Sequence, residues 1–377
     1  GSVIFQYAQL VKGDQPKDYL KTTDRLDIPR IDYTNGEPSI LLEPSRTNSV
    51  NTSLDFTSPN WTLGATTVTS NNIASPELIT NASKLQADGT NASHYILDTA
   101  GSCTSGSSYT YSIFVKKGTL NYVQLIFGSA TFGTLHQNFD LDKGEIGSSS
   151  GTLTAFINKF PNNWYRIGIT ATATANGNIT PFVILANSST MARIAGFDSS
   201  DYIYVYGAQI EAGSYATSLI HTSGSAVTRS ADAANNAGNS DLINSTEGVL
   251  YAEIKALAND GTNRQISISN GTATERVYFG FRANTNEFIL SSKDSSYVIA
   301  TVNDATDYNK YAFQYKSGNF KAFVNGVSYS LTANGGSLPT SLDRLNFDDG
   351  AGNSGFYGNA KMVAVFKEAL TDLELEK

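Results

Sequence analysis

Aromatic, amide and cationic side chains share one face of several predicted strands in the first half of the chain. In 108–118, 122–127, 135–142 and 164–173, they alternate with apolar residues at the two-residue period of a β-strand. Aromatic rings can stack on the apolar face of a sugar, while amides and charged groups bind its hydroxyls. We therefore predict a carbohydrate-binding face on these strands. Its candidate residues are Phe114, Lys116, Tyr122, Gln124, His136, Asn138, Trp164 and Arg166.

The same pattern also fits a face that is covered by the partner sheet or by an N-terminal strap. Trp164 begins a strand, where a tryptophan usually packs against its neighbours. Trp61, within SPNWT, is a further candidate for ligand contact, and packing at a sheet edge is the alternative. The prediction of a binding face therefore depends on which face of the sheet is open.

Oxygen ligands for a cation occur in the segment FDDGAGNSG. Asp348, Asp349 and Asn353 have a spacing that Ca²⁺ could use, although they match no strict calcium-loop motif. A solvated Asp-Gly turn is the alternative interpretation. The sequence indicates no required cofactor, and a structural calcium ion at this loop is the one metal site that it suggests.

Patterns typical of catalytic sites are missing from the sequence. Glu247 and Glu253 lack an acidic partner between them at the strand spacing of a retaining glycosidase. No GxSxG, P-loop or dinucleotide-binding motif occurs. The single cysteine, Cys103, excludes an internal disulfide and a cysteine-based zinc site. We predict a protein that is not an enzyme, with a polysaccharide-degrading lyase or hydrolase as the alternative.

Charge and hydropathy exclude two further classes of partner. The 377 residues include 26 Lys and Arg against 34 Asp and Glu, a net charge of −8, with no basic cluster for nucleic-acid phosphates. No apolar run approaches the roughly 20 residues that span a bilayer. We therefore expect neither nucleic-acid binding nor membrane insertion.

The strand pattern predicts an all-β fold with two antiparallel β-sandwich domains, a fold class to which low charge and many Tyr, Thr, Ser, Asn and Gly residues are suited. Residues 1–48 are interpreted as a closing strand followed by an extended strap, and 49–230 as the first sandwich. A small, polar linker at 231–245 leads to a second sandwich at 246–377. Only the end of the chain looks helical, where Thr371 and Glu374 form a capping-box pattern.

Residues 3–23 and 203–223 are similar to each other. With an offset of 200, Ala8 aligns with Ala208 and Gly13 with Gly213. Both segments read as a strand, a Gly turn and a short extended stretch, as copies of one structural unit would. The first copy then closes a preceding module, and we expect upstream modules to be missing from this sequence.

Two resemblances cover nearly the whole chain. The segments EPSRTNSVNTSLDFTSPNWT, NNWYRIGITATA and YIYVYGAQIEAGSYATSLIHTSGSAVTR resemble tail-fibre and other appendage proteins of bacteriophages, with jelly rolls similar to carbohydrate-binding modules. Residues 246–377 resemble the concanavalin A-like, laminin-G-type sandwich, through YAFQYKSGNFKAFVNGVS and FYGNAKMVAVFKEALTDLELE. Such sandwiches serve many roles, so the second resemblance is specific for fold and weak for function.

These resemblances imply a virion tail or surface appendage that is made in the host cytoplasm and acts outside the cell. It would bind bacterial surface polysaccharide during adsorption, beside other virion or same-chain modules, and a homo-oligomer such as a trimer would be common among such fibres. A purely structural spacer or decoration protein is the alternative role.

Overall fold

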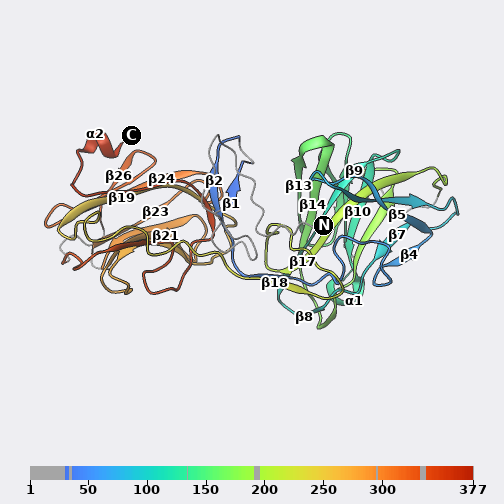
Figure 1. Cartoon of the computed structure of the whole chain (residues 1–377), viewed down its shortest axis with the longest axis horizontal. Helices are drawn as coiled ribbons and strands as arrows, with labels where there is room; N and C mark the ends of the chain where they lie inside the picture. Colours follow the sequence, from blue (N-terminus) through green and yellow to red (C-terminus); the bar gives the residue numbers. More distant parts are fainter. Residues whose placement is uncertain are drawn as a thin grey trace, which may run out of the picture. The chain divides into compact units, whose positions relative to one another are not determined.

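The computed structural model describes residues 30–33, 36–133, 135–190, 196–293, 296–331 and 337–376. It divides into unit 1, which runs to Pro44 and resumes at Asp232, and unit 2, Ser45–Ala231. Each unit is built from stacked antiparallel sheets (Figure 1). The predicted all-β fold with two antiparallel sandwiches is confirmed. The helical elements of the described residues are short: α1 (Ser129–Phe132), α2 (Asp372–Leu375) and the 3-10 turn η1 (Pro161–Asn163).

Unit 2 contains two six-stranded sheets, named here after their strands β10 and β9. The β10 sheet has the order β12 (Glu145–Ser150), β11 (His136–Asp140), β10 (Tyr122–Phe127), β16 (Pro181–Ala186), β7 (Tyr95–Leu97) and β4 (Thr62–Gly64). The β9 sheet has the order β13 (Thr154–Phe160), β14 (Trp164–Thr172), β9 (Ser108–Lys117), β17 (Tyr202–Ala212), β6 (Thr80–Ala87) and β5 (Thr66–Ala74). Two short ribbons add β8 (Ser102–Cys103) with β15 (Gly177–Asn178), and β3 (Arg46–Asn48) with β18 (Val227–Arg229).

The core of unit 2 lies between these two sheets. Ile113 and Ile167 from the β9 sheet belong to the same buried cluster as Val123, Leu125 and Phe139 from the β10 sheet. The two-residue alternation therefore identified the inward-facing positions of these strands correctly. Every residue between them along a strand faces away from this core.

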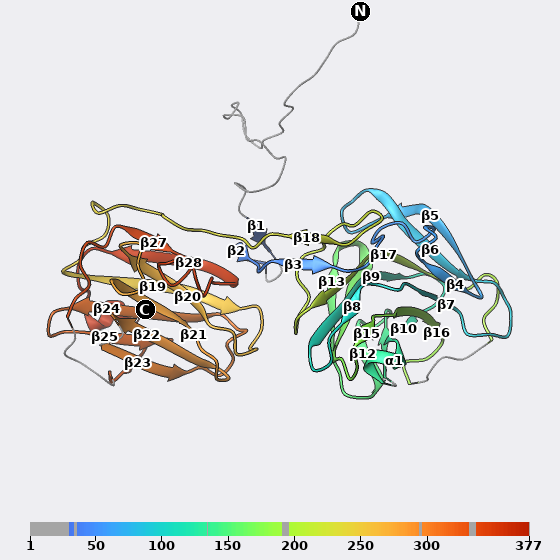
Figure 2. The same ribbon diagram turned by 90° about the horizontal axis from the view of Figure 1, so that it is seen from below.

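Unit 1 is a sandwich of a seven-stranded and a five-stranded sheet (Figure 2). The first has the order β1 (Arg30–Asp32), β2 (Ser39–Leu42), β28 (Gly358–Phe366), β19 (Glu247–Ala256), β24 (Asn309–Lys316), β25 (Lys321–Val324) and β26 (Val327–Tyr329). The second has the order β23 (Ser296–Thr301), β22 (Glu287–Ser292), β21 (Arg276–Phe281), β20 (Arg264–Ser269) and β27 (Arg344–Asn346). Its core contains Phe279, Phe288 and Tyr311, of which the last two rings stack 3.5 Å apart.

The strap belongs to this second sandwich as an edge ribbon. Strand β2 pairs with β28 through Ile40 and Ala360, and β1 pairs with β2. Arg30 forms ion pairs with Glu43 and Asp232, the residues beside the points where the chain leaves unit 1 and returns to it. Unit 2 is thus inserted into the sequence of unit 1.

The segment predicted as a linker, 231–245, is hydrogen-bonded to unit 1. Asn235 donates its amide to Asp348 at 2.6 Å, and the Asn236 N–H donates to the side chain of Asn346 at 2.8 Å. Small polar residues suit a linker, but they also suit an extended segment that is held by side-chain amides, which is the role they have here.

Two local predictions can be compared with the structure. The Glu374 carboxylate accepts a hydrogen bond from the Thr371 N–H at 2.8 Å, which confirms the capping box before α2. In the second copy of the repeat, β17 is followed by Gly213 with φ of 137°. The first copy, 3–23, lies outside the described residues.

No helix of the described part of the chain is long and apolar enough to cross a membrane.

Candidate functional site

The predicted binding face is divided between the two sheets of unit 2. Tyr122, Gln124, His136 and Asn138 lie on the β10 sheet, whereas Phe114, Lys116, Trp164 and Arg166 lie on the β9 sheet. Both groups face away from the shared core, so they lie on opposite outer faces of the sandwich. The structure therefore does not bring the predicted set together on one surface.

Several members of the set are buried rather than open. Gln124 and Asn138 are fully buried, and the Gln124 amide donates to the Asn138 side-chain oxygen at 2.6 Å. Arg166 is buried too, donating to the Ser112 hydroxyl at 3.0 Å, with its guanidinium 5.3 Å from the Phe114 ring. The expected exposure of these residues is wrong, because alternation along a strand identifies a face but not what covers it.

Both tryptophans are structural in this fold. Trp164 is fully buried in a small cluster on the outer face of the β9 sheet, with Phe114 and Tyr206. Its indole N–H donates to the Ala74 carbonyl at 3.1 Å. Trp61 is buried in the main core and donates to the Thr52 carbonyl at 2.9 Å.

Three predicted residues remain accessible. Lys116, Tyr122 and His136 are half-buried, and the His136 ring lies 2.8 Å from the Ser150 hydroxyl. Of these three, Lys116 lines a concavity.

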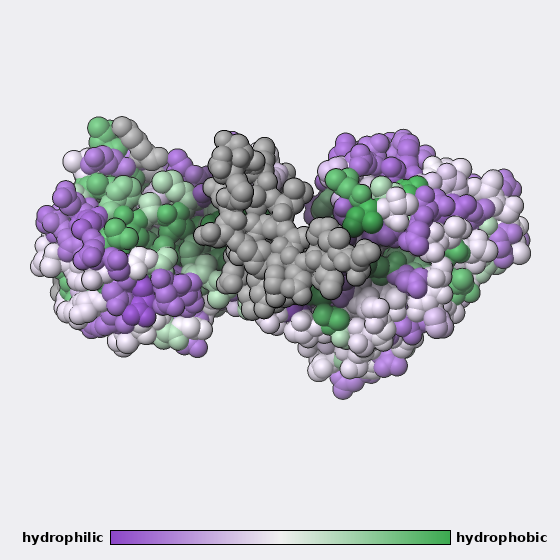
Figure 3. Space-filling model, viewed as in Figure 1, coloured by the Kyte–Doolittle hydropathy of each residue, from purple (hydrophilic) through white to green (hydrophobic). Residues whose placement is uncertain are grey.

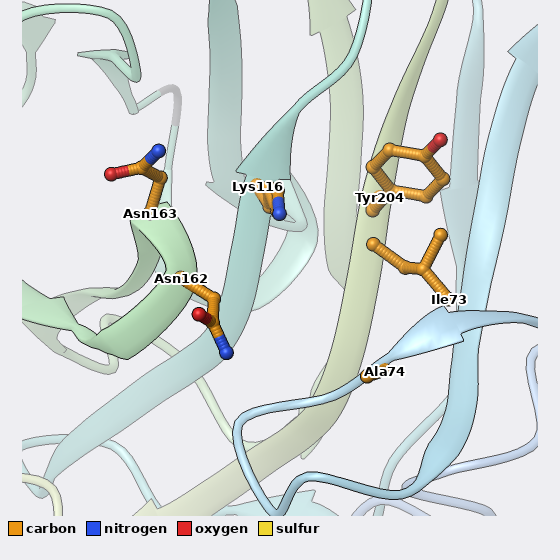
Figure 4. Close-up of a pocket in the computed structure, with 6 residues that line it drawn as sticks. All are labelled: Ile73, Ala74, Lys116, Asn162, Asn163 and Tyr204. Atoms are coloured by element: carbon orange, nitrogen blue, oxygen red, sulfur yellow. The ribbon is translucent and has the colours of Figure 1, made fainter.

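That concavity, named here the Tyr204 hollow, lies on the outer face of the β9 sheet. It has a volume of about 490 Å³ and is lined by Ile73, Ala74, Lys116, Asn162, Asn163 and Tyr204. In Figure 4, Lys116 lies between the two asparagines on one side and Tyr204 with Ile73 on the other. These residues come from β5, β9, β17 and the η1 turn. The hollow therefore combines an aromatic ring, two side-chain amides and one cation.

The η1 turn between β13 and β14 holds the two amides at the rim. Asn162 and Asn163 both have φ of 59°, the left-handed conformation that asparagine tolerates better than most residues. Pro161 begins the turn, and Trp164, which directly follows, is anchored in the sheet. Both amide side chains are exposed, so they can meet a ligand without losing a buried hydrogen bond.

Tyr204 is held by packing on both sides. Together with Ile73, it packs against the Trp164 cluster, and its ring meets the edge of Tyr202 with centroids 5.2 Å apart. Burial and the neighbouring Tyr202 hydroxyl raise the pKa of Tyr204 to about 12. The phenol thus stays neutral at physiological pH, and its half-buried ring can contact a ligand.

Sequence reasoning identified Lys116 but missed Tyr204 and the asparagine pair. The alternating tyrosines of YIYVYG and the PNN turn are visible in the sequence. The pairing of β17 with β9 sets Tyr204 opposite Lys116, and only the folded structure brings the two asparagines of the η1 turn beside them.

The predicted calcium ligands serve the loop that carries them. The Asp348 carboxylate accepts hydrogen bonds from Asn235 and from the Gly350 N–H, each at 2.6 Å. Asp349 accepts from the N–H groups of Ala351 and Asn353, both at 2.9 Å. Within the described ranges, no group of three His, Cys, Asp or Glu side chains could hold a metal ion.

The two glutamates considered for catalysis lie beside lysines. Glu247 accepts from Lys316 at 2.8 Å, and that hydrogen bond holds the pKa of Glu247 below its usual value. Glu253 lies 3.5 Å from Lys361.

Distant likenesses to two solved structures are found for parts of this chain. No family model matches the sequence, and no curated protein matches it. Among solved structures, a CBM40 module of the Ruminococcus gnavus IT-sialidase, bound to α2,3-sialyllactose, aligns at 18% identity over 35% of this chain and 82% of that one, with a TM-score of 0.29. Domains LG4-5 of the mouse laminin α1 chain align at 7% identity over 74% of this chain and 86% of that one, with a TM-score of 0.25. Since these scores are low, neither a fold name nor a ligand is carried over to this chain.

Proposed function

We propose that unit 2 binds a glycan in the Tyr204 hollow. The observation that carries this proposal is the meeting of one aromatic ring, two exposed amides and one lysine at a single concavity. A volume of about 490 Å³ lies within the range of pockets for small ligands. The ring would stack on the apolar face of a sugar, while Asn162 and Asn163 would bind its hydroxyls.

At the level of the whole protein, we propose a non-catalytic module of a bacteriophage appendage that adsorbs to host-surface polysaccharide outside the cell. The resemblance of the quoted segments to tail-fibre proteins supports this role. The Tyr204 hollow is open on one side. The side of unit 2 that Figure 3 shows is largely hydrophilic with small apolar patches. Such a shallow site should bind weakly on its own, so display on an oligomer such as a trimer would raise the affinity through avidity.

Affinity electrophoresis tests the glycan proposal. The protein is run through gels that contain alginate, polygalacturonate, dextran, galactomannan or bacterial capsular polysaccharides. Retardation in one gel that free polymer reverses is the expected result. Unchanged mobility in every gel would contradict glycan binding and favour the spacer role. A clear zone along the track would reveal polymer degradation and contradict the non-catalytic proposal.

Two variants connect binding to the hollow. Tyr204→Ala removes the ring, and Asn162→Gly removes an amide while glycine keeps the left-handed backbone without strain. Both should abolish or strongly weaken the retardation. Asn162→Gly should leave thermal unfolding close to that of the parent, whereas Tyr204→Ala, which also removes packing against the Trp164 cluster, should lower the melting temperature moderately while the chain stays folded. Tyr33→Ala is the matched control, because Tyr33 is 64% exposed and belongs to unit 1. Equal retardation of all three variants would place the binding elsewhere.

A further inference from the structure

Two lysines, Lys84 and Lys116, form a cross-strand row with Tyr204 beside the Tyr204 hollow. Tyr204 on β17 is directly opposite Lys116 on β9 and, on its other side, directly opposite Lys84 on β6. Residues that are opposite each other in a sheet share a face, so both lysines lie on the outer face with Tyr204. Two strand spacings separate the lysine backbones by about 10 Å.

No carboxylate in the described part of the chain pairs with either lysine of this row. Among the residues that the structure describes, no ion pair involves Lys84 or Lys116, whereas Lys117, the next residue, pairs with Asp142. The ammonium group of Lys84 instead lies 5.4 Å from the centroid of the Tyr202 ring. No acidic residue is among the described residues that line the hollow. In a chain with a net charge of −8, this row is a local positive site.

Tyrosine rings accompany the two cations. Tyr202 and Tyr204 meet edge to face at 5.2 Å, and Tyr202 lies directly over Gly118, where a Cβ atom would come within 2.3 Å of its ring. The row thus alternates cations with aromatic planes along one face. A single sugar in the hollow would therefore lie beside Lys116, and a second sugar toward Tyr202 would lie beside Lys84.

We propose that the hollow selects a carboxylated sugar chain. In this proposal, which rests on the glycan-binding function above, one carboxylate pairs with Lys116 while its ring packs on Tyr204. The carboxylate of a neighbouring sugar pairs with Lys84. The asparagine amides supply uncharged hydrogen bonds and set no charge preference, so the two lysines determine selectivity for acidic over neutral chains.

The test compares each retarding polymer with its carboxyl-reduced form, which keeps the backbone and loses the charge. Alginate or polygalacturonate should retard the protein, whereas their reduced forms, dextran and galactomannan should not. Raising the salt from roughly 50 to 500 mM should weaken the retardation, because exposed ion pairs are screened. Equal retardation by a polymer and its reduced form, or retardation by neutral polymers alone, would overturn the acidic selectivity and leave glycan binding intact. No retardation by any polymer would overturn both proposals.

Charge variants test the row itself. Because exposed ion pairs are individually weak, Lys116→Gln and Lys84→Gln should each reduce affinity for the acidic polymer by about fivefold, and together by roughly 25-fold. Lys143→Gln, the same charge change at an exposed turn after β11, should leave affinity unchanged. Asn162→Asp, which keeps a side chain that tolerates the left-handed backbone, should weaken acidic binding by adding a negative charge. If the Lys84 and Lys116 variants behave like the Lys143 variant, the proposal is wrong.

Discussion

Replacing Trp164 by alanine should destabilise unit 2 severely, because this side chain is fully buried on the outer face of the β9 sheet. Deleting a buried tryptophan typically costs about 3–5 kcal/mol of unfolding free energy. Part of this loss comes from the Ala74 carbonyl, which loses the indole N–H at 3.1 Å. With an m-value of about 2 kcal/mol per M, the urea midpoint should fall by roughly 1.5–2.5 M.

Tryptophan fluorescence measures this change in unit 2 alone. The chain has 2 Trp residues, Trp61 and Trp164, and both lie within Ser45–Ala231. In the Trp164→Ala variant, Trp61 remains as the single reporter, buried in the core between the two sheets. Urea titrations of the full chain, followed by this signal, therefore give the stability of unit 2 while unit 1 stays silent.

A matched control variant distinguishes the loss of buried packing from the effect of shortening any large apolar side chain. Ile146→Ala also shortens a large apolar side chain in unit 2, but Ile146 lies on the edge strand β12 and is 47% exposed. This substitution should lower the unfolding free energy of unit 2 by less than about 1 kcal/mol. If Trp164→Ala costs no more than this control, the side chain does not pack as described, and its assignment as a structural residue fails.

Three further predictions concern other parts of the chain. Gly118→Ala should displace Tyr202, because a Cβ atom would lie 2.3 Å from its ring and 2.5 Å from its backbone carbonyl oxygen, so acidic-polymer retardation should weaken in a variant that still unfolds cooperatively; unchanged retardation would exclude Tyr202 from the site. Burial alone would raise the pKa of Asp260, but the charge and hydrogen bond of Arg264, 2.7 Å away, together with hydrogen bonds from Thr262, hold this pKa below its usual value. The ionised Asp260 therefore stabilises the folded chain at pH values above the pKa that it has in the unfolded chain, and this stabilisation is lost as the pH falls through its pKa in the folded chain. The melting temperatures of Asp260→Asn and the parent should thus be similar in acid and differ near neutral pH. The same difference at all pH values would contradict the ion pair. Chelation of calcium should leave thermal unfolding unchanged, since backbone N–H groups at 2.9 Å already bind Asp349; a clear drop in melting temperature would instead support a calcium site in its loop.

Local features of this protein follow from its sequence. Alternation in 108–118 and 164–173 correctly separates inward residues such as Ile113 and Ile167 from outward ones, because the side-chain period of a strand is a local property. The capping box at Thr371 and the Gly213 turn after β17 are equally local. The all-β class follows from the same patterns, repeated along the chain.

Only the tertiary structure decides which outward residues meet. Gln124 and Trp164 have the same outward phase, yet they lie on different sheets, and both are covered. Tyr204, Lys116 and Lys84 are far apart in sequence and become neighbours through strand pairing. Strand order and register depend on non-local contacts, and so does the cover over each face. The chemistry of the site was therefore visible in the sequence as residue types, while its location was set by the fold.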